Sequence, residues 1–398
     1  MKIEDIKFFK TKEGLALIEK YKELSTEELE MLSFNLAKNN VPHYSYLITL
    51  LKLRKKSINK FSKSEEMFFD SLGLEMSTDE RVSKHIAERF KRSKKVLEIG
   101  CGLGGNTIFL ANNSRVLAID RSETSVEIAR HNTKIYGVEN EVDFKIGDAL
   151  DYLDENIDAV FIDPMRAREG KTKTRSFLNS EPNIIEALPR IMKHTKNIGI
   201  KVSPAFDYKE LKLLPEAPEV EVIALKNENK VAMLWFGDLR MNKSKATIIS
   251  EKNHVEITDK GNFGEIIVQK EPKEYIYEPN KAIIKAHLID ELADEYNLSK
   301  LNKNIAFLSS AKKETSEDYK FKTYKLVDYQ PFSLKSLKKN LKARRIERIE
   351  IVNRGTPINA GKLAKELKLK EGGTTVVLIG KLRDDKNYYF ITEKTKSD

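Results

Sequence analysis

Short apolar runs alternate with amphipathic segments between residues 95 and 237. The runs are VLEI (96–99), VLAI (116–119), VDFKI (142–146), AVFI (159–162), IGIKV (198–202), VEVIAL (220–225) and VAMLWF (231–236). Because segments with helical spacing separate the first five runs, they predict parallel βαβ units. Only the turn-like residues 226–230 separate the last two runs, which predict a β-hairpin. We therefore expect an α/β sheet of five parallel strands that ends in this hairpin.

Other patterns flank this sheet on both sides. Residues 1–92 have the apolar spacing of helices, and Ser77 with Glu80 forms a capping-box signature. The stretch 238–260 is polar and mixed, and predicts a linker or a small β extension. Beyond it the pattern predicts helices at 281–296, 333–343 and 360–367, and strands at 346–352, 374–380 and 387–392. We expect a helical region at 1–92, the α/β domain at 93–240 and an α+β domain at 241–398.

Composition narrows the class of protein. The 398 residues are 40% apolar and 33% charged, with a net charge of +10. The positive sign favours a polyanionic partner such as nucleic acid, whereas a hot environment would explain only the charge density. A single cysteine excludes an internal disulfide and a multi-cysteine zinc site. The charged N-terminus and the absence of a long apolar run predict a soluble, cytoplasmic protein that does not bind membranes.

Four glycines fall within six residues directly after the first run, in VLEIGCGLGGNTIFLA (96–111). Gly100, Gly102 and Gly105 match GxGxxG, and Gly104 is the fourth. Such glycines permit a tight turn, close approach of a ligand and packing of the next helix. Asp120 follows Gly100 by twenty residues, at the end of the second run, where an acid can hold ribose hydroxyls. NAD and S-adenosylmethionine fit these features equally.

Three further positions distinguish the two cofactors. Glu98 lies two residues before Gly100, where it would face the cationic amino group of a methionine moiety. Asp148 follows the third run, near the expected position of an adenine exocyclic amine. Asp163-Pro164 ends the fourth run, beside the crevice in which open α/β sheets bind ligands. Acids at successive strand ends favour S-adenosylmethionine over NAD.

With the terminal hairpin, residues 94–237 resemble the class I S-adenosylmethionine-dependent methyltransferases. The resemblance is carried by Glu98, Gly100, Gly102, Gly104, Asp120, Asp148 and Asp163-Pro164. It implies a Rossmann-like sheet and methyl transfer from S-adenosyl-L-methionine, without a metal. The cofactor-binding residues that we expect are Glu98, Gly100, Cys101, Gly102, Gly104, Asp120, Arg121, Asp148, Ala149 and Asp163.

Residues after the fourth run suggest the acceptor side. Asp163 can orient an acceptor N–H or take its proton, and we expect Asp163, Pro164 and Arg166 to be catalytic. The loop MRAREGKTKTR (165–175) is basic and could hold a phosphate backbone, or be an ordinary solvated loop. The sequence DPMR lacks the aromatic residue of DPPY, which argues against methylation of an exocyclic amine. Cys101, the only thiol, lies on the cofactor side, which argues against a covalent cysteine intermediate.

Three later segments resemble a THUMP-like domain that follows such a methyltransferase. They are YIYEPNKAIIKAHLIDELADEYNLSKL (275–301), RRIERIEIVNRG (344–355) and LKLKEGGTTVVLIG (367–380). Together with Ser77 to Arg89, DPMR and KVSPAFDY (201–208), the resemblance covers about residues 70–398. It implies binding of structured RNA, commonly tRNA.

Residues 319–348 give this reading independent support. They hold ten Lys or Arg against two Asp or Glu, with five aromatic residues interleaved. They predict either a surface that binds phosphates and stacks on bases, or a solvated basic helix above core aromatics. We expect a methyltransferase that modifies a base of tRNA or rRNA. The alternatives are a protein or small-molecule methyltransferase, a non-catalytic RNA-binding factor that keeps the fold, and an NAD-dependent oxidoreductase.

Overall fold

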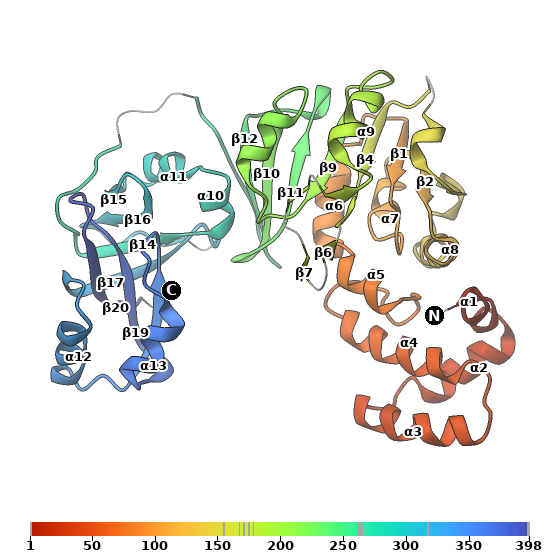
Figure 1. The fold of residues 1–398 in the computed structure, drawn as a ribbon, viewed down its shortest axis with the longest axis horizontal. Coiled ribbons are helices and arrows are strands. Elements are labelled where there is room, and N and C mark those ends of the chain that lie inside the picture. The colour runs from red at the N-terminus through yellow and green to blue at the C-terminus, as the bar shows by residue number, and fades with distance from the viewer. Residues whose placement is uncertain are drawn as a thin grey trace. The chain divides into compact units, whose positions relative to one another are not determined.

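The chain forms two compact units in the computed structural model (Figure 1). The structure describes residues 2–153, 156–166, 168–169, 172–173, 176–177, 179–261, 266–316 and 318–395, with the backbone alone at 166, 168–169 and 172–173. One unit holds Met1–Glu219 and Lys230–Met241, and the other holds Val220–Asn229 and Asn242–Asp398. Among the described residues, no helix is both long and apolar enough to cross a membrane.

The first unit contains the predicted parallel sheet. Its strands are β1 (Lys95–Ile99), β2 (Arg115–Asp120), β3 (Val142–Ile146), β4 (Ala159–Ile162), β9 (Ile198–Val202) and β11 (Glu228–Trp235). Their order is β11-β9-β4-β1-β2-β3, with β11 antiparallel to β9 and the other five strands parallel. All residues of β4 and β9 are buried, as expected for strands that helices cover on both faces. The α/β prediction is confirmed.

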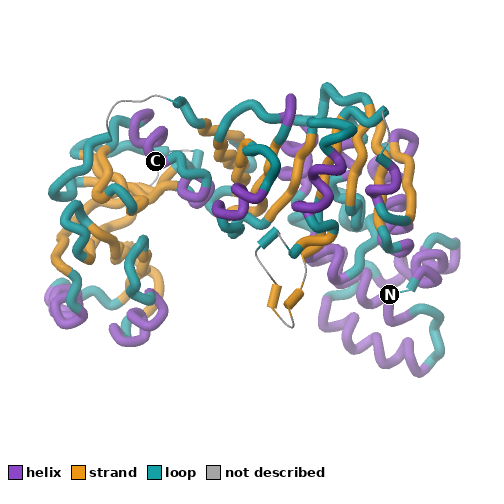
Figure 2. Tube along the Cα trace, turned by 45° about the horizontal axis from the view of Figure 1, so that its top comes forward, coloured by secondary structure: helices purple, strands orange, loops and turns teal. Residues whose placement is uncertain are grey.

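Helices cover the faces of this sheet (Figure 2). They are α6 (Glu80–Glu88), α7 (Thr107–Leu110), α8 (Glu123–Tyr136) and α9 (Ile184–Ile191). Ser122 caps α8 at its start by accepting from the backbone N–H of Ser125, and Gly137 ends it in the left-handed region. The predicted capping box is wrong: Asp79 caps α6, while Ser77 ends the preceding helix. Glu80 instead accepts hydrogen bonds from Ser62.

The N-terminal residues form helices, as predicted. These are α1 (Ile3–Phe9), α2 (Lys12–Tyr21), α3 (Thr26–Lys38), α4 (Tyr44–Ser57) and α5 (Ser71–Met76). A capping box of Ser25 and Glu28 starts α3, and Asp70 caps α5. In Figure 1, α1 to α4 gather at one end of the sheet of their own unit.

Asn132 of α8 connects three segments of the first unit. Its Nδ2 donates to the carbonyl oxygens of Phe68 (3.1 Å) and Leu103 (2.9 Å), and its Oδ1 accepts from the Phe68 N–H (2.8 Å). Asn132 is fully buried. One side chain thus joins the segment before α5, the glycine loop and the helix that follows β2.

The second unit begins with a small group of strands. Strand β10 (Glu219–Leu225) is parallel to β12 (Ser244–Ile249), which is antiparallel to β13 (His254–Thr258). The polar stretch 238–260 is therefore a β extension and not a linker. The division between the units passes between β10 and β11, the two strands of the predicted hairpin.

A seven-stranded sheet forms the rest of this unit. Its order is β15 (Ser299–Asn302), β16 (Ile305–Ser310), β14 (Tyr275–Pro279), β17 (Phe321–Pro331), β20 (Asn387–Lys394), β19 (Lys370–Lys381) and β18 (Arg348–Asn353). The helix predicted at 281–296 is two helices, α10 (Lys281–Lys285) and α11 (Ile289–Glu295). His287 between them has a φ of 60°, a left-handed conformation that a continuous α-helix does not allow.

Two further helices cover one face of this second sheet. They are α12 (Leu334–Ala343) and α13 (Ala360–Leu367), which lie side by side in Figures 1 and 2. Their buried leucines pack against Val377 and Ile379 of β19, while Val376 and Leu378 join the core on the opposite face. This alternation follows from the period of two along a strand.

Replacing Asn132 with alanine leaves three buried backbone groups without their partners. We expect Asn132→Ala to lower the free energy of unfolding by about 2–5 kcal/mol, since an unsatisfied buried polar group costs about 1–3 kcal/mol. Denaturant titration followed by circular dichroism measures the loss. Lys134→Ala, an exposed position on the same helix, is the control. Equal stability of the two variants would contradict the connecting role of Asn132.

Candidate functional site

A cleft of about 840 Å³ lies at the carboxyl ends of β1, β2 and β4 in the first unit. Its volume is within the ~300–1,000 Å³ typical of small-molecule sites. Strand order reverses between β1 and β4, and open α/β sheets bind ligands at such a switch point. The predicted residues that line it are Gly100, Cys101, Gly102, Asp120, Arg121, Asp148, Ala149, Asp163 and Pro164. The structure brings these nine residues together.

Two glycines of the loop are required for different reasons. Gly100 has a φ of +83°, and a Cβ atom built there would lie 2.8 Å from the carbonyl oxygen of Asp163. Gly104 has a φ of +79°, and a Cβ there would lie 3.2 Å from Ala129 of α8. The first glycine thus permits the close approach of β1 and β4 at the cleft. Gly104 does not line the cleft. The lack of a side chain there lets α8 pack against the loop.

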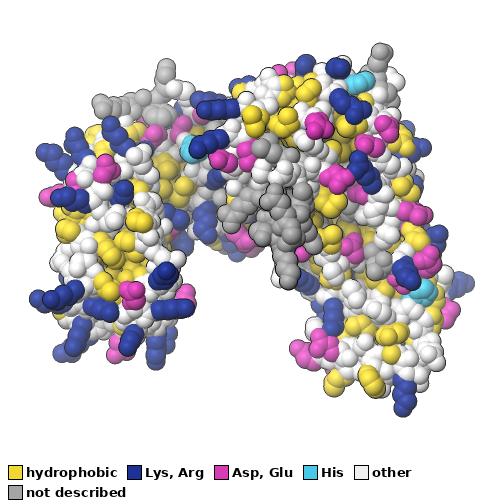
Figure 3. Space-filling view, viewed as in Figure 1, with side chains coloured by type: hydrophobic (Ala, Val, Ile, Leu, Met, Phe, Trp, Pro, Cys, Tyr) yellow, Lys and Arg dark blue, Asp and Glu magenta, His cyan; other side chains and the backbone are white. Residues whose placement is uncertain are grey.

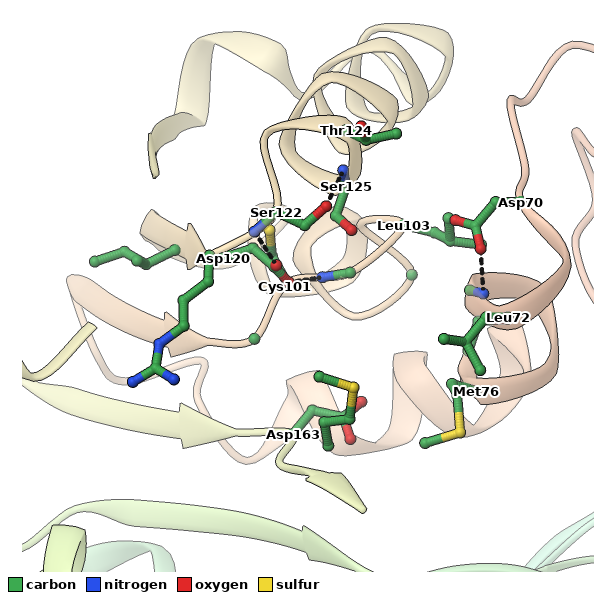
Figure 4. Close-up of a pocket in the computed structure, with 18 of the residues that line it drawn as sticks. Asp70, Leu72, Met76, Cys101, Leu103, Asp120, Ser122, Thr124, Ser125 and Asp163 are labelled. Atoms are coloured by element: carbon green, nitrogen blue, oxygen red, sulfur yellow. Dashed lines mark hydrogen bonds between the residues drawn. The ribbon is translucent and has the colours of Figure 1, made fainter. Parts of the chain in front are cut away.

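Asp120 fixes the glycine loop to the end of β2. Its Oδ2 accepts from the Gly102 N–H (3.0 Å), and its Oδ1 accepts from the Ser122 N–H (2.9 Å), as Figure 4 shows. Each carboxylate oxygen can accept more than one hydrogen bond. Asp120 can therefore hold the loop and still accept from a ligand hydroxyl in the cleft.

Asp148 and Arg121 form a charged rim. The Oδ1 of Asp148 accepts from the Leu150 N–H (3.0 Å), and its Oδ2 lies 2.8 Å from Arg121 Nη2. The Leu150 N–H and then Arg121 hold the pKa of Asp148 below its ordinary value. Arg121 also pairs with Glu181. Because Arg121 is 57% exposed, these pairs position the rim more than they stabilise the fold.

Asp163 has two partners that the sequence analysis did not identify. Its Oδ2 lies 2.6 Å from Nζ of Lys201 on β9 and accepts from Asn106 Nδ2 (3.2 Å). Lys201 is 8% exposed, and its Nζ also lies 3.4 Å from the Met76 carbonyl oxygen. Within the described part of the chain, Oδ1 of Asp163 accepts no hydrogen bond. It therefore remains available to a molecule in the cleft.

Lys201 had a signal in the sequence that could have been used. It is the one charge in the apolar run IGIKV, and a buried strand holds a charge only when that charge is paired. Asn106 had no such signal, since an asparagine at the start of a helix is common. The pairing of Lys201 with Asp163 depends on how β4 and β9 come together.

Glu98 lies behind the glycine loop and not on the wall of the cleft. It is fully buried, and neither carboxyl oxygen has a hydrogen-bond partner among the described residues. Burial, with the charges of Asp163 and Asp120, raises the pKa of Glu98 to about 8, although the nearby Thr107 hydroxyl opposes this rise. The carboxyl is therefore mostly protonated at neutral pH. The sequence analysis expected Glu98 to face the cofactor, but Glu98 is not among the residues that line the cleft.

Cys101 lines the cleft as a buried thiol. Burial, together with the charges of Glu98 and Asp120, raises its pKa well above the ordinary value. Because the thiolate is the nucleophilic form, Cys101 is unsuited to attack a base. Arg166 belongs to the short strand β5 (Met165–Arg166), but its side chain and those of the basic loop lie outside the described residues.

The N-terminal helices supply a wall of the cleft that the sequence analysis did not anticipate. Asp5, His43, Tyr46 and Asp70 line it, and His43 Nδ1 lies 2.7 Å from Asp5 Oδ1. Leu72 and Met76 of α5 point into the same space as Asp163 (Figure 4). The helical region is therefore part of the site.

Three family models match parts of the chain. The model described as RNA cap guanine-N2 methyltransferase matches residues 93–166. A ferredoxin-like domain matches residues 275–315, and the model described as THUMP domain-like matches residues 321–394.

Comparisons with known proteins and solved structures agree with these matches. An uncharacterized S-adenosylmethionine-dependent methyltransferase of Mycobacterium tuberculosis is 22% identical over 347 residues, which are 85% of this chain and 92% of the relative. A probable cobalt-precorrin-6B C(15)-methyltransferase of Saccharolobus solfataricus is 32% identical over 111 residues, which are 26% of this chain and 53% of the relative. A Porphyromonas gingivalis protein, solved as a candidate methyltransferase, has a TM-score of 0.78 at 22% identity over 100% of both chains. This last match shows the shared fold.

The cleft fits the cofactor of these relatives. Gly100 and Gly102 leave bare backbone on the wall of the cleft, and the carboxylates of Asp120 and Asp148 line it and could accept hydrogen bonds from a bound molecule. The chain is an S-adenosylmethionine-dependent methyltransferase with a THUMP-like domain, and S-adenosylmethionine is its cofactor.

The buried Glu98 carboxyl makes stability depend on pH. Its pKa is about 8 when folded against an ordinary 4.5, so its full contribution is present below pH 4.5 and is lost as the pH rises to 8. We expect the unfolding free energy of the wild type, minus that of Glu98→Gln, to fall over this window with a slope of up to about 1.4 kcal/mol per pH unit. Urea titrations across the window measure it. Glu88→Gln, at an exposed position, should give a flat difference; a flat difference for Glu98→Gln would contradict the assignment.

Lys201 can be tested separately from the fold. Lys201→Met removes the cation beside the Asp163 carboxylate, which is 20% exposed and keeps its hydrogen bond from Asn106, so the loss of stability should be smaller than the ~3–5 kcal/mol of a fully buried pair. We expect kcat to fall at least about tenfold, because the carboxylate loses its orientation, while cofactor affinity changes little since Lys201 does not line the cleft. Lys245→Met is the matched control: Lys245 is also buried in a strand and paired with a glutamate, but in the other unit. If both variants lose the same share of kcat, Lys201 has only a structural role.

Proposed function

We propose that this methyltransferase modifies a nitrogen of a base in structured RNA, either tRNA or rRNA. The observation that carries the proposal is the THUMP-like match at residues 321–394, in the same chain as the cofactor cleft. The match to an RNA cap guanine-N2 methyltransferase model and the net charge of +10 add support.

Asp163 is the proposed catalytic residue. Bound S-adenosylmethionine supplies a methyl group on a sulfonium, and the transfer is an in-line displacement in which positioning provides much of the acceleration. Lys201 and Asn106 hold Oδ2, so Oδ1 can accept a hydrogen bond from the acceptor N–H. The acceptor nitrogen would form the new bond to carbon as the bond from carbon to sulfur breaks with its electron pair left on sulfur, and Asp163 or water would take the acceptor's proton.

Several observations limit which atom of the base could accept the methyl group. Methylation at pyrimidine C5 generally needs a thiolate, which the buried Cys101 does not provide. The guanine-N2 family model extends to Arg166 and favours an exocyclic amine, whereas DPMR lacks the stacking aromatic of such enzymes. We therefore propose that the methyl acceptor is a nitrogen atom of a base, and we do not choose between an exocyclic amine and a ring nitrogen. A base within a stem would have to flip into the cleft.

We also propose roles for two other predicted residues. Pro164 lines the cleft beside Asp163 and would limit the position of the acceptor. Arg166 would contact an RNA phosphate, a proposal that rests on the basic sequence of 165–175.

Labelled S-adenosylmethionine incubated with total tRNA or rRNA tests the proposal. We expect label in RNA, a loss of about 100-fold or more in kcat for Asp163→Asn, and near wild-type turnover for Cys101→Ser. Nucleoside mass spectrometry then identifies the methylated atom. Label that enters protein or metabolites but not RNA would favour the alternative substrates. Full turnover by Asp163→Asn with unchanged cofactor affinity would remove Asp163 from the mechanism.

A further inference from the structure

Lysines form a continuous stripe on each of the two helices that cover the second sheet. On α12 they are Lys335, Lys338, Lys339 and Lys342, and on α13 they are Lys362 and Lys365. The α12 lysines recur at i, i+3, i+4 and i+7, which places them on one side of the helix. Leu337 and Leu341 occupy the other side and are buried. We call these six exposed lysines the α12/α13 basic face.

Figure 3 shows Lys and Arg side chains gathered over these two helices. Helix stability explains Lys342 and Lys365, which lie in the last turns of α12 and α13 where the dipole favours a cation, but not the lysines of the first turns. The first turns of α12 and α13 contain no acid, whereas α3 and α8 start with glutamates. Lys335 and Lys362 lie in these first turns, where the helix dipole disfavours a positive charge. The sequence therefore places lysines where a helix alone would favour acids.

Glu366 is an exposed acid on α13, four residues after Lys362, but it forms no ion pair with the described lysines of the basic face. In the part of the chain that the structure describes, none of its six lysines forms an ion pair. Buried or half-buried lysines of the same unit are paired, such as Lys300 with Asp290 and Lys320 with Glu295. Like charges spaced three and four residues apart on a helix repel one another. An external anion would relieve this repulsion.

The aromatic residues near this face do not offer a stacking surface. Phe321 and Tyr324 are 5% and 3% exposed, in the core of the second sheet. Tyr329 and Phe332 are half-buried and pack against the core clusters, whereas Tyr319 is 41% exposed. Of the two interpretations of residues 319–348, the structure therefore favours a basic helix that lies above core aromatic residues. The face offers charge without base stacking.

We propose that the α12/α13 basic face binds the phosphate backbone of the RNA substrate. The inference rests on the proposed function and names the surface that holds the RNA. Lysine ammonium groups neutralise phosphates and release condensed counterions, so binding weakens steeply with salt. Because these contacts read no base edges, the face positions RNA and leaves the choice of base to the cleft.

Salt-dependent binding of a tRNA mixture tests the inference on the full-length protein. The test variant is Lys338→Gln, Lys339→Gln, Lys342→Gln and Lys365→Gln together, since glutamine keeps helix propensity and removes charge. The matched control is Lys12→Gln, Lys20→Gln, Lys38→Gln and Lys56→Gln, exposed lysines of the other unit with the same change in net charge. Affinities are measured between about 50 and 200 mM salt.

We expect the test variant to bind tRNA at least about tenfold more weakly, with a log–log salt slope smaller by about 3 if all four lysines contact phosphates. The control should bind within about twofold, because it leaves every lysine of the basic face in place. Affinity for S-adenosylhomocysteine should be unchanged in both. The corresponding four-arginine variant, which keeps the charges, should retain tRNA binding.

Two outcomes overturn the inference in distinguishable ways. If the wild type methylates RNA and the test variant keeps its affinity and salt slope, the basic face is not the RNA surface, but the proposed function stands. If the wild type shows no salt-dependent binding of tRNA or rRNA, the proposed function fails and the inference with it. Loss of binding in both the test variant and its arginine counterpart would show that packing, and not charge, was removed.

Discussion

The ion pair between the buried Lys201 and Asp163, which lines the cleft, is the interaction on which the cleft depends. It joins the end of β4 to β9, and the same ammonium lies 3.4 Å from the carbonyl oxygen of Met76, in the last turn of α5. A mostly buried pair has a more defined geometry than an exposed pair such as Arg121–Asp148. Lys201 and Asn106 hold Oδ2 of Asp163, whereas Oδ1 accepts no hydrogen bond from the described residues. Lys201 also contacts the last turn of α5, whose Leu72 and Met76 line the cleft.

Two acids of the first unit, Asp163 at the cleft and the buried Glu98, have contrasting environments. Asp163 has a cation and an amide beside it, whereas Glu98 has no hydrogen-bond partner and a pKa raised to about 8. Asp120 differs again, since its carboxylate accepts from the Gly102 N–H and holds the glycine loop to β2. The three acids thus differ in burial and in hydrogen-bond partners.

The two units would have different roles in the proposed reaction. The first contains the cofactor cleft and the acceptor-side carboxylate, and the second carries unpaired lysines on α12 and α13. A surface of lysines gives affinity without sequence selectivity, so discrimination between bases would lie in the cleft. Asp5, His43 and Leu72 of the N-terminal helices form part of the wall of that cleft.

The sequence by itself determined the α/β class, the glycine loop and the strand-end acids at 120, 148 and 163. Strand runs, helical periods and glycine turns are local patterns, and parallel strands bring their carboxyl ends to one edge. The tertiary structure alone decided that Lys201 and Asn106 hold Asp163, that Glu98 is buried, and that α5 faces the cleft. Lys201 is separated from Asp163 by 38 residues and from Met76 by 125, so its contacts depend on how distant segments pack. His287 divides a predicted helix, and Asp79 replaces Ser77 as a cap, because neighbouring backbone geometry overrides a short pattern. Periodicity describes which side of an element is buried, but packing decides which partner each buried charge finds.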